Sequence, residues 1–197
     1  SGDGMASTVS LGHNGHLTRK VATPIIHSAG RFWDVITVLC GFKPNRHAGK
    51  ITGLAAYRPS PTAYQKLRTL YGGNAEALRF ENRERRAWRA ERDRILEILP
   101  GASREELAYA AQKVLEEAWT AVVRAAVQRF GIRSIVLAGG TFANVRLNQM
   151  ITELPEVERV HIFPHMGDGG LSMGAAFLAT ARQRPLPPFR LEHLYYG

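Results

Sequence analysis

Two glycine-rich segments in the C-terminal half of the chain carry the residues that could take part in chemistry. In the first, a short apolar run at residues 135–138, predicted to be a strand, is followed by Gly139 and Gly140, and then by Asn144. A glycine pair lets the backbone turn with positive φ and lets a ligand approach without a Cβ in the way. Free N–H groups at the start of the next helix would face this turn, as in an anion- or nucleotide-binding site. The Asn144 side chain could hydrogen-bond a ribose or phosphate, or instead satisfy the backbone of the first helical turn.

The second segment repeats this order of strand, turn and helix. Residues 160–163 are predicted to form a strand, and the turn after it holds Gly167, Asp168 and Gly169. Successive units of this kind place their turns on one edge of a sheet, where ligands bind in open α/β folds. The Asp168 carboxylate is suited to a hard or borderline metal ion. A plain connection stays the alternative for either turn, because a glycine pair alone is a weak signal.

Positions upstream could contribute to a phosphate site. Asp3 and Gly4 precede a predicted hairpin, where a carboxylate and backbone amides can face a metal-bound phosphate or form an ordinary Asx turn. Gly41 ends a predicted helix as a C-cap. Lys50 stands between two glycines in a predicted loop, from which it could reach a phosphate or remain a surface lysine.

The elements that must position these residues follow from helical spacing and capping signals. Ser103 and Glu106 form a capping box at the start of a helix predicted to end at about Phe130. Further helices are predicted at residues 29–41, 63–71, 75–99, 142–151 and 171–182.

The excess of positive charge could indicate either a nucleic-acid site or a solvated helical face. The net charge is +9, and seven arginines with four acidic residues fall between Arg79 and Arg94. We favour a solvated helical face with ion pairs over a nucleic-acid site, because stacking aromatics are nearly absent there. No apolar run approaches the roughly 20 residues of a membrane span, no signal-peptide pattern opens the chain, and the single cysteine, Cys40, suits a reducing compartment. We therefore expect a cytoplasmic protein that binds neither membrane nor nucleic acid.

Three motifs, GKITGLAAY, LAGGTFANVRLN and FPHMGDGGLSMGAA, together resemble the actin-like (ASKHA) domain of O-carbamoyltransferases. That family includes nodulation-factor and antibiotic-tailoring enzymes and is more distantly related to the tRNA threonylcarbamoyladenosine synthase subunit. The resemblance runs from about Asp3 to Ala179. It implies an α/β fold, namely the second lobe of an actin-like ATPase (ribonuclease H-like) domain, with a mixed sheet flanked by helices and a helical insertion. The implied division is residues 1–58 for the first hairpin, helix and Gly-Lys loop, 59–102 for the insertion, 103–184 for the rest of the lobe, and 185–197 for a linker tail.

The resemblance implies transfer of a carbamoyl group from carbamoyl-adenylate to a hydroxyl of a small-molecule acceptor. The adenylate would be made from carbamoyl phosphate and ATP in a separate C-terminal domain. The implied cofactors are this nucleotide and a divalent metal, iron by resemblance, with magnesium or manganese as alternatives. The implied partners are that domain and a first lobe carrying a histidine pair, neither of which the sequence contains, so we expect the chain alone to be inactive. No catalytic residue is assigned.

The resemblance also assigns binding residues. Those expected to bind nucleotide are Gly139, Gly140, Asn144, Gly41, Lys50, Gly167 and Gly169; those expected to bind phosphate are Asp3 and Gly4; and the expected metal ligand is Asp168.

Other functions remain open from the sequence. A tRNA threonylcarbamoyladenosine-type enzyme would use the basic surface for RNA. An actin-like-fold kinase would need an acidic base near the γ-phosphate. A non-catalytic nucleotide-binding module would bind without turnover.

Overall fold

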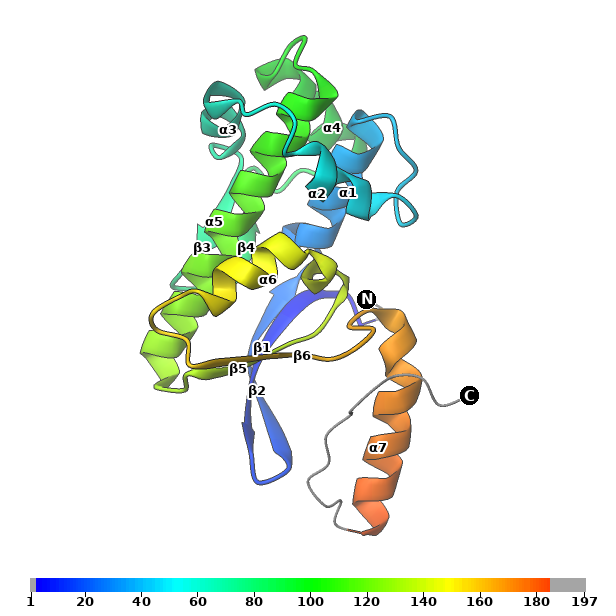
Figure 1. Ribbon diagram of the computed structural model, residues 1–197, viewed down its shortest axis with the longest axis vertical. Helices are drawn as coiled ribbons and strands as arrows, with labels where there is room; N and C mark the ends of the chain where they lie inside the picture. Colours follow the sequence, from blue (N-terminus) through cyan, green and yellow to red (C-terminus); the bar gives the residue numbers. More distant parts are fainter. Residues whose placement is uncertain (1–2, 185–197) are drawn as a thin grey trace.

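One long helix, α5 (Arg104–Phe130), runs through the structure, and several of the other helices and strands pack on it (Figure 1). The computed structural model describes residues 3–184. The helix begins at the predicted capping box, in which the Ser103 hydroxyl accepts the Glu106 N–H at 3.2 Å and the Glu106 carboxylate accepts the Ser103 N–H at 2.9 Å. Gly131, with a φ of 68°, closes its last turn. Because both end signals are local, the sequence predicted this helix correctly.

The remaining elements are short. The other helices are α1 (Ala29–Leu39), α2 (Ala48–Leu54), α3 (Pro61–Leu67), α4 (Trp88–Ile98), α6 (Val145–Thr152) and α7 (Leu171–Gln183), with 3-10 turns η1 (Ile25–His27), η2 (Gly140–Ala143) and η3 (Asp168–Gly170). The strands pair antiparallel as β1 (Met5–His13) with β2 (His16–Pro24) and as β3 (Tyr71–Asn74) with β4 (Arg79–Asn82), and parallel as β5 (Ser134–Leu137) with β6 (Arg159–Ile162).

This arrangement confirms the α/β class but not the predicted single mixed sheet. Residues 3–184 form three separate two-stranded sheets. Strands β5 and β6 are four residues long and pair only with each other, so both outer edges of this pair are open within the described chain. The tail predicted at residues 185–197 lies outside the described residues.

The core of the helical part, drawn at the top of Figure 1, is built on three aromatic rings. Phe32 of α1, Tyr71 of β3 and Phe80 of β4 are almost fully buried, with ring centroids 4.5 to 6.0 Å apart. Strand β3 also approaches α5 closely at Gly73. A Cβ added at this glycine would lie only 2.5 Å from the Ala118 carbonyl oxygen. These contacts join the β3–β4 hairpin to α1 and α5 in one core.

The segment 59–102, predicted as a helical insertion, contains this β-hairpin. The helix predicted over residues 75–99 is wrong in its first half, because positions in β4 alternate between half-buried and buried. The turn before β4 is held by Asn74, whose Oδ1 accepts a backbone N–H at 2.8 Å, and by Leu78, whose φ is 50°. Burial of Phe80 in the aromatic cluster outweighs the helical propensity of the surrounding arginines. The helix predicted to reach residue 71 likewise ends earlier, at Leu67, and residue 71 is instead the first residue of β3.

The hairpin β1–β2, the pair β5–β6 and helix α7 make up the lower part of Figure 1 and are far more open. No residue of α7 is buried. Val136 of β5 is 72% exposed, and Leu171 and Leu178 of α7 are 69% and 56% exposed. None of the helices formed by residues 3–184 combines the length and apolar character needed to cross a membrane.

We predict that Gly73→Ala lowers the free energy of unfolding by about 1–3 kcal/mol, because the new methyl group meets the backbone of α5. Gly53 is the matched control, since it lies in α2 with no atom within 4 Å of an added Cβ. Gly53→Ala should therefore stabilise the chain by up to about 1 kcal/mol through helix propensity. Urea unfolding followed by circular dichroism measures the free energy of unfolding of both variants. Equal changes in the two would contradict the close approach of β3 to α5.

We also predict that buried His27 makes the chain acid-sensitive. His27 is 4% exposed and its Nδ1 accepts the Asn82 N–H at 3.2 Å. Burial, aided by the nearby Arg79, lowers the pKa of His27 below its ordinary value of 6.5. The folded state then binds fewer protons than the unfolded state, so the stability contributed by neutral His27 is present above pH 6.5 and is lost as the pH falls through the lowered pKa.

The variant His27→Asn tests this, because its amide oxygen can accept the same N–H but does not titrate. Urea unfolding at about pH 7.5 and about pH 5 should show a smaller loss of stability on acidification in His27→Asn than in the unaltered chain. Identical losses in both proteins would refute the assignment.

Candidate functional site

The two glycine turns lie side by side at one end of the β5–β6 pair, as the sequence predicted. The parallel register pairs Leu137 with Ile162, so both strands end at the same edge. Just beyond this edge, the Gly139 N–H donates to the Met166 carbonyl oxygen at 2.6 Å. One backbone hydrogen bond therefore joins the first turn to the second.

The first turn leaves backbone donors free. Gly139 has a φ of 106°, which residues with side chains rarely adopt. The turn continues as η2, so α6 begins at Val145 and not at residue 142 as predicted. Among the hydrogen bonds of residues 3–184, none uses the N–H of Gly140 or of Thr141. Two successive donors are thus available to an oxygen atom of a ligand.

The second turn is shaped by His165. A Cβ added at Gly169 would lie 2.4 Å from ring atoms of His165, so this ring occupies the space above the glycine. Gly167 precedes η3, and Asp168 begins it with an exposed side chain. The carboxylate of Asp168 is therefore accessible from outside.

Asn144 is buried between α6 and α5, and its side chain is occupied by protein groups. It is 8% exposed, and its Oδ1 accepts the Leu147 N–H at 3.1 Å and an N–H of Gln112 at 3.2 Å. Its Nδ2 donates to the Gln112 Oε1 at 2.8 Å. The backbone-satisfying role that the sequence left open is confirmed, because Asn144 caps α6. Its role as a nucleotide ligand stays a prediction and draws no support from these contacts.

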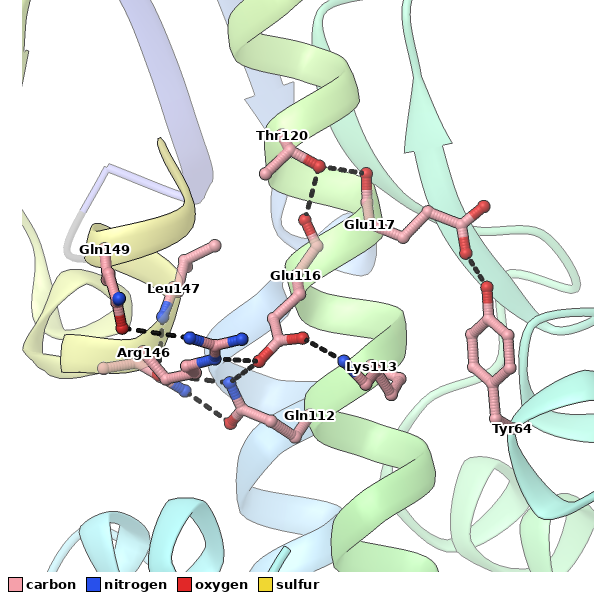
Figure 2. Close-up of polar contacts among 10 residues, drawn as sticks. Tyr64, Gln112, Lys113, Glu116, Glu117, Thr120, Arg146, Leu147 and Gln149 are labelled. Atoms are coloured by element: carbon pink, nitrogen blue, oxygen red, sulfur yellow. Dashed lines mark hydrogen bonds and ion pairs between the residues drawn. The ribbon is translucent and has the colours of Figure 1, made fainter. Parts of the chain in front are cut away.

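Gln112 and Glu116 of α5 complete a polar network that the sequence analysis missed (Figure 2). Gln112 is 5% exposed and Glu116 is 2% exposed. The Gln112 Nε2 donates to the Glu116 carboxylate at 2.9 Å, and the same carboxylate pairs with Lys113 Nζ at 3.1 Å and Arg146 Nε at 3.7 Å. A buried carboxylate requires such partners. The available signal was a pair of polar residues one helical turn apart on the apolar side of α5.

The residues predicted near the start of the chain adopt local turn roles. The Asp3 Oδ1 accepts the Met5 N–H at 3.1 Å, which is the Asx turn that the sequence left open. The Gly4 carbonyl oxygen accepts the Ile25 N–H at 3.1 Å and so closes the base of the β1–β2 hairpin. Gly41 follows α1 with a φ of 79°. Their phosphate and nucleotide roles stay predictions.

Lys50 lies in helix α2 and not in the predicted loop. Ile51 and Leu54 of α2 are buried, and this helix packs on α5 in spite of its glycines. Tertiary packing thus outweighs the low helix propensity of glycine here. The Lys50 Nζ lies 5.2 Å from the centre of the Phe42 ring, a cation–π distance. A phosphate role for Lys50 stays a prediction.

The described residues do not make up the metal site that the resemblance implies. Within residues 3–184, no three His, Cys, Asp or Glu side chains gather to hold a metal ion. A metal at Asp168 would therefore need ligands from outside residues 3–184.

Two cavities of the structure lie away from the glycine turns. Their volumes are about 220 and 240 Å³, they lie beside Trp88 and beside Arg83, and neither is lined by the glycine turns. The paired turns form an open surface, in which the first turn offers N–H donors and the second offers the Asp168 carboxylate.

A family model described as the carbamoyltransferase N-terminus matches residues 1–177. Uncharacterized protein MJ1058 of Methanocaldococcus jannaschii is 33% identical over 153 residues, which cover 77% of this chain and 25% of that protein. Uncharacterized protein MJ1051 of the same organism is 28% identical over an alignment of 207 positions, which covers 100% of this chain and 38% of that protein. The chain thus spans well under half the length of these relatives.

Gly139→Ala should destabilise the chain by about 1–2 kcal/mol, because a residue with a Cβ is strained at positive φ. Gly140 is the matched control, since its φ is not positive and no atom lies within 4 Å of an added Cβ. Gly140→Ala should change the free energy of unfolding by less than about 0.5 kcal/mol. Denaturant unfolding compares the two variants, and a Gly139→Ala variant as stable as Gly140→Ala would show that the turn can relax.

Proposed function

Because the chain belongs to the carbamoyltransferase N-terminal family, we propose that it is the nucleotide- and metal-binding lobe of an O-carbamoyltransferase. In this proposal it helps to transfer a carbamoyl group from carbamoyl-adenylate to a hydroxyl of a small-molecule acceptor. Another part of the protein makes the adenylate from carbamoyl phosphate and ATP.

The observation that carries this proposal is the hydrogen bond between the two glycine turns. It brings the unbonded N–H groups of Gly140 and Thr141 and the exposed Asp168 to one edge of the β5–β6 pair. Backbone donors at such an edge bind phosphate oxygens and stabilise negative charge that develops on a leaving phosphate. They would therefore hold the AMP portion of carbamoyl-adenylate.

The transfer itself is a simple substitution at the carbamoyl carbon. The acceptor hydroxyl oxygen forms a bond to this carbon, the bond from the carbon to the AMP phosphate oxygen breaks, and the hydroxyl proton is released. AMP leaves with the electron pair of the broken bond. The amides of Gly140 and Thr141 would bind the AMP phosphate as its charge rises. Asp168 would supply one ligand to a divalent metal, with the other ligands coming from a different lobe.

The open surfaces support a proposal about partners. Exposed apolar side chains lie on the elements that carry the turns, among them Val136 of β5, Val145 of α6 and Leu171 of α7, which are 72%, 74% and 69% exposed. Large apolar side chains that are exposed to solvent can form a contact surface for another domain. We therefore propose that a first lobe and an adenylate-forming domain pack against this half of the chain in the full-length protein, in the cytoplasm.

One observation favours a second candidate, a tRNA-modifying enzyme. Of the seven arginines between residues 79 and 94, Arg83, Arg85 and Arg89 form no ion pair among the ion pairs of the described chain. Unpaired arginines on an exposed surface attract phosphates. The other arginines of this stretch pair with neighbouring carboxylates, as predicted.

We predict that the full-length protein converts a hydroxyl compound into its carbamate when supplied with ATP and carbamoyl phosphate. Mass spectrometry of a panel of sugars and other polyhydroxy compounds should show a carbamate, with AMP, pyrophosphate and the inorganic phosphate of carbamoyl phosphate released. Asp168→Asn should reduce the yield at least tenfold (about 1.4 kcal/mol), because the metal loses a charged ligand, whereas Gly53→Ala should leave it unchanged.

Each rival function gives a different product. ADP with a phosphorylated acceptor would identify a kinase, and a tRNA affinity that falls steeply with salt, together with carbamoylated adenosine, would identify the tRNA enzyme. ATP binding with no product of any kind would identify a binding module. Any of these results would replace the O-carbamoyltransferase proposal.

A further inference from the structure

A buried carboxylate decides the orientation of two amide side chains beside the first glycine turn. Ionised Glu116 only accepts hydrogen bonds, so Gln112 must turn its NH₂ group toward it, and does so at 2.9 Å. The Gln112 oxygen then faces Asn144, whose NH₂ group donates to it at 2.8 Å. The Asn144 oxygen is left to accept the Leu147 N–H at 3.1 Å. The cap of α6 therefore depends on a charge on α5.

This orientation cannot reverse without loss of several bonds. A flipped Gln112 would set its oxygen against the Glu116 carboxylate, and a flipped Asn144 would set its NH₂ group against the Leu147 N–H. Lys113 and Arg146 offset the charge of Glu116 from two different helices. Figure 2 shows that α5 and α6 meet through these side chains.

The same contacts fix the glycine turn. Asn144 ends η2 and caps α6, and its backbone N–H donates to the Thr141 carbonyl oxygen at 3.3 Å. Asn148, one turn later in α6, adds a second anchor because its Nδ2 donates to the Phe142 carbonyl oxygen at 2.7 Å. The loop that carries the unbonded N–H groups is thus tied to α5 through Asn144.

We propose that Gln112 and Glu116 are positioning residues for the nucleotide: through Asn144 they hold the N–H groups of Gly140 and Thr141 in place to bind the phosphate of the adenylate. This inference rests on the proposed function. Neither Gln112 nor Glu116 touches the ligand. Their effect is preorganisation, since donors fixed before binding stabilise charge better than donors that must be ordered by it.

The test uses the full-length protein and compares two products of one reaction. Pyrophosphate reports formation of the adenylate in the other domain, and carbamate reports transfer at the glycine turns. Gln112→Leu keeps the size of the side chain and removes its hydrogen bonds. It should lower the carbamate formed per pyrophosphate released by about two- to tenfold, the equivalent of about one hydrogen bond. Glu116→Gln, which removes the orienting charge, should act in the same direction.

The control and a double variant separate positioning from folding. Gln128→Leu makes the same substitution at an exposed position near the far end of α5, away from the network, so it should leave the ratio unchanged. Asn144→Ser keeps a capping hydroxyl but loses the amide. If Gln112 acts through Asn144, adding Gln112→Leu to Asn144→Ser should lower the ratio by less than twofold further, about 0.4 kcal/mol.

The outcomes are distinct. An unchanged ratio in Gln112→Leu and Glu116→Gln overturns the inference and leaves the proposed function intact. Equal losses of pyrophosphate and carbamate, with a lowered melting temperature, show that the network only holds the fold, and this too overturns it. An unaltered protein that forms neither product overturns the proposed function and the inference together.

Discussion

Close packing on opposite sides of α5 is the constraint on which the rest of the structure depends. Ala118 and Glu116 are about 200° apart around the helix, at about 100° per residue. On the Ala118 side, Gly73 lets β3 approach so closely that a Cβ there would lie 2.5 Å from the helix backbone. On the Glu116 side, a buried charge holds α6. The core hairpin and the glycine turns therefore keep a fixed relation through one rigid element.

The two sides of α5 are held by different interactions, apolar packing against β3 and hydrogen bonds to α6. The contact with β3 is apolar packing, which is strong but sets no unique direction. The contact with α6 is a set of hydrogen bonds that allows one arrangement of Gln112 and Asn144, because a carboxylate cannot donate. Buried polar groups are expensive when they are left unpaired. Their presence at the base of the glycine turn fits a need for orientation more than for stability.

The sequence predicted the features that depend on neighbouring residues. The capping box at Ser103, the strand–turn–helix order around Gly139 and the pairing of two glycine turns all follow from short local signals. It failed where distant contacts decide, as when burial of Phe80 makes a strand of an arginine-rich segment and when packing makes a helix of the loop around Lys50. The Gln112–Asn144 contact joins residues 32 positions apart, and no local pattern encodes it.

The glycine turns lie in the open half of the molecule, so their hydrogen-bond donors are exposed to water. Gly140, which carries one of the unbonded donors, is exposed, and Val136 of β5 and Val145 of α6 are 72% and 74% exposed. Hydrogen bonds to a phosphate on such a surface compete directly with water and are weak. The same donors become strong when water is excluded, because the local dielectric falls. A second domain that packed on the exposed valines would bury them and also strengthen the donors. Assembly of the domains and nucleotide binding would therefore favour each other.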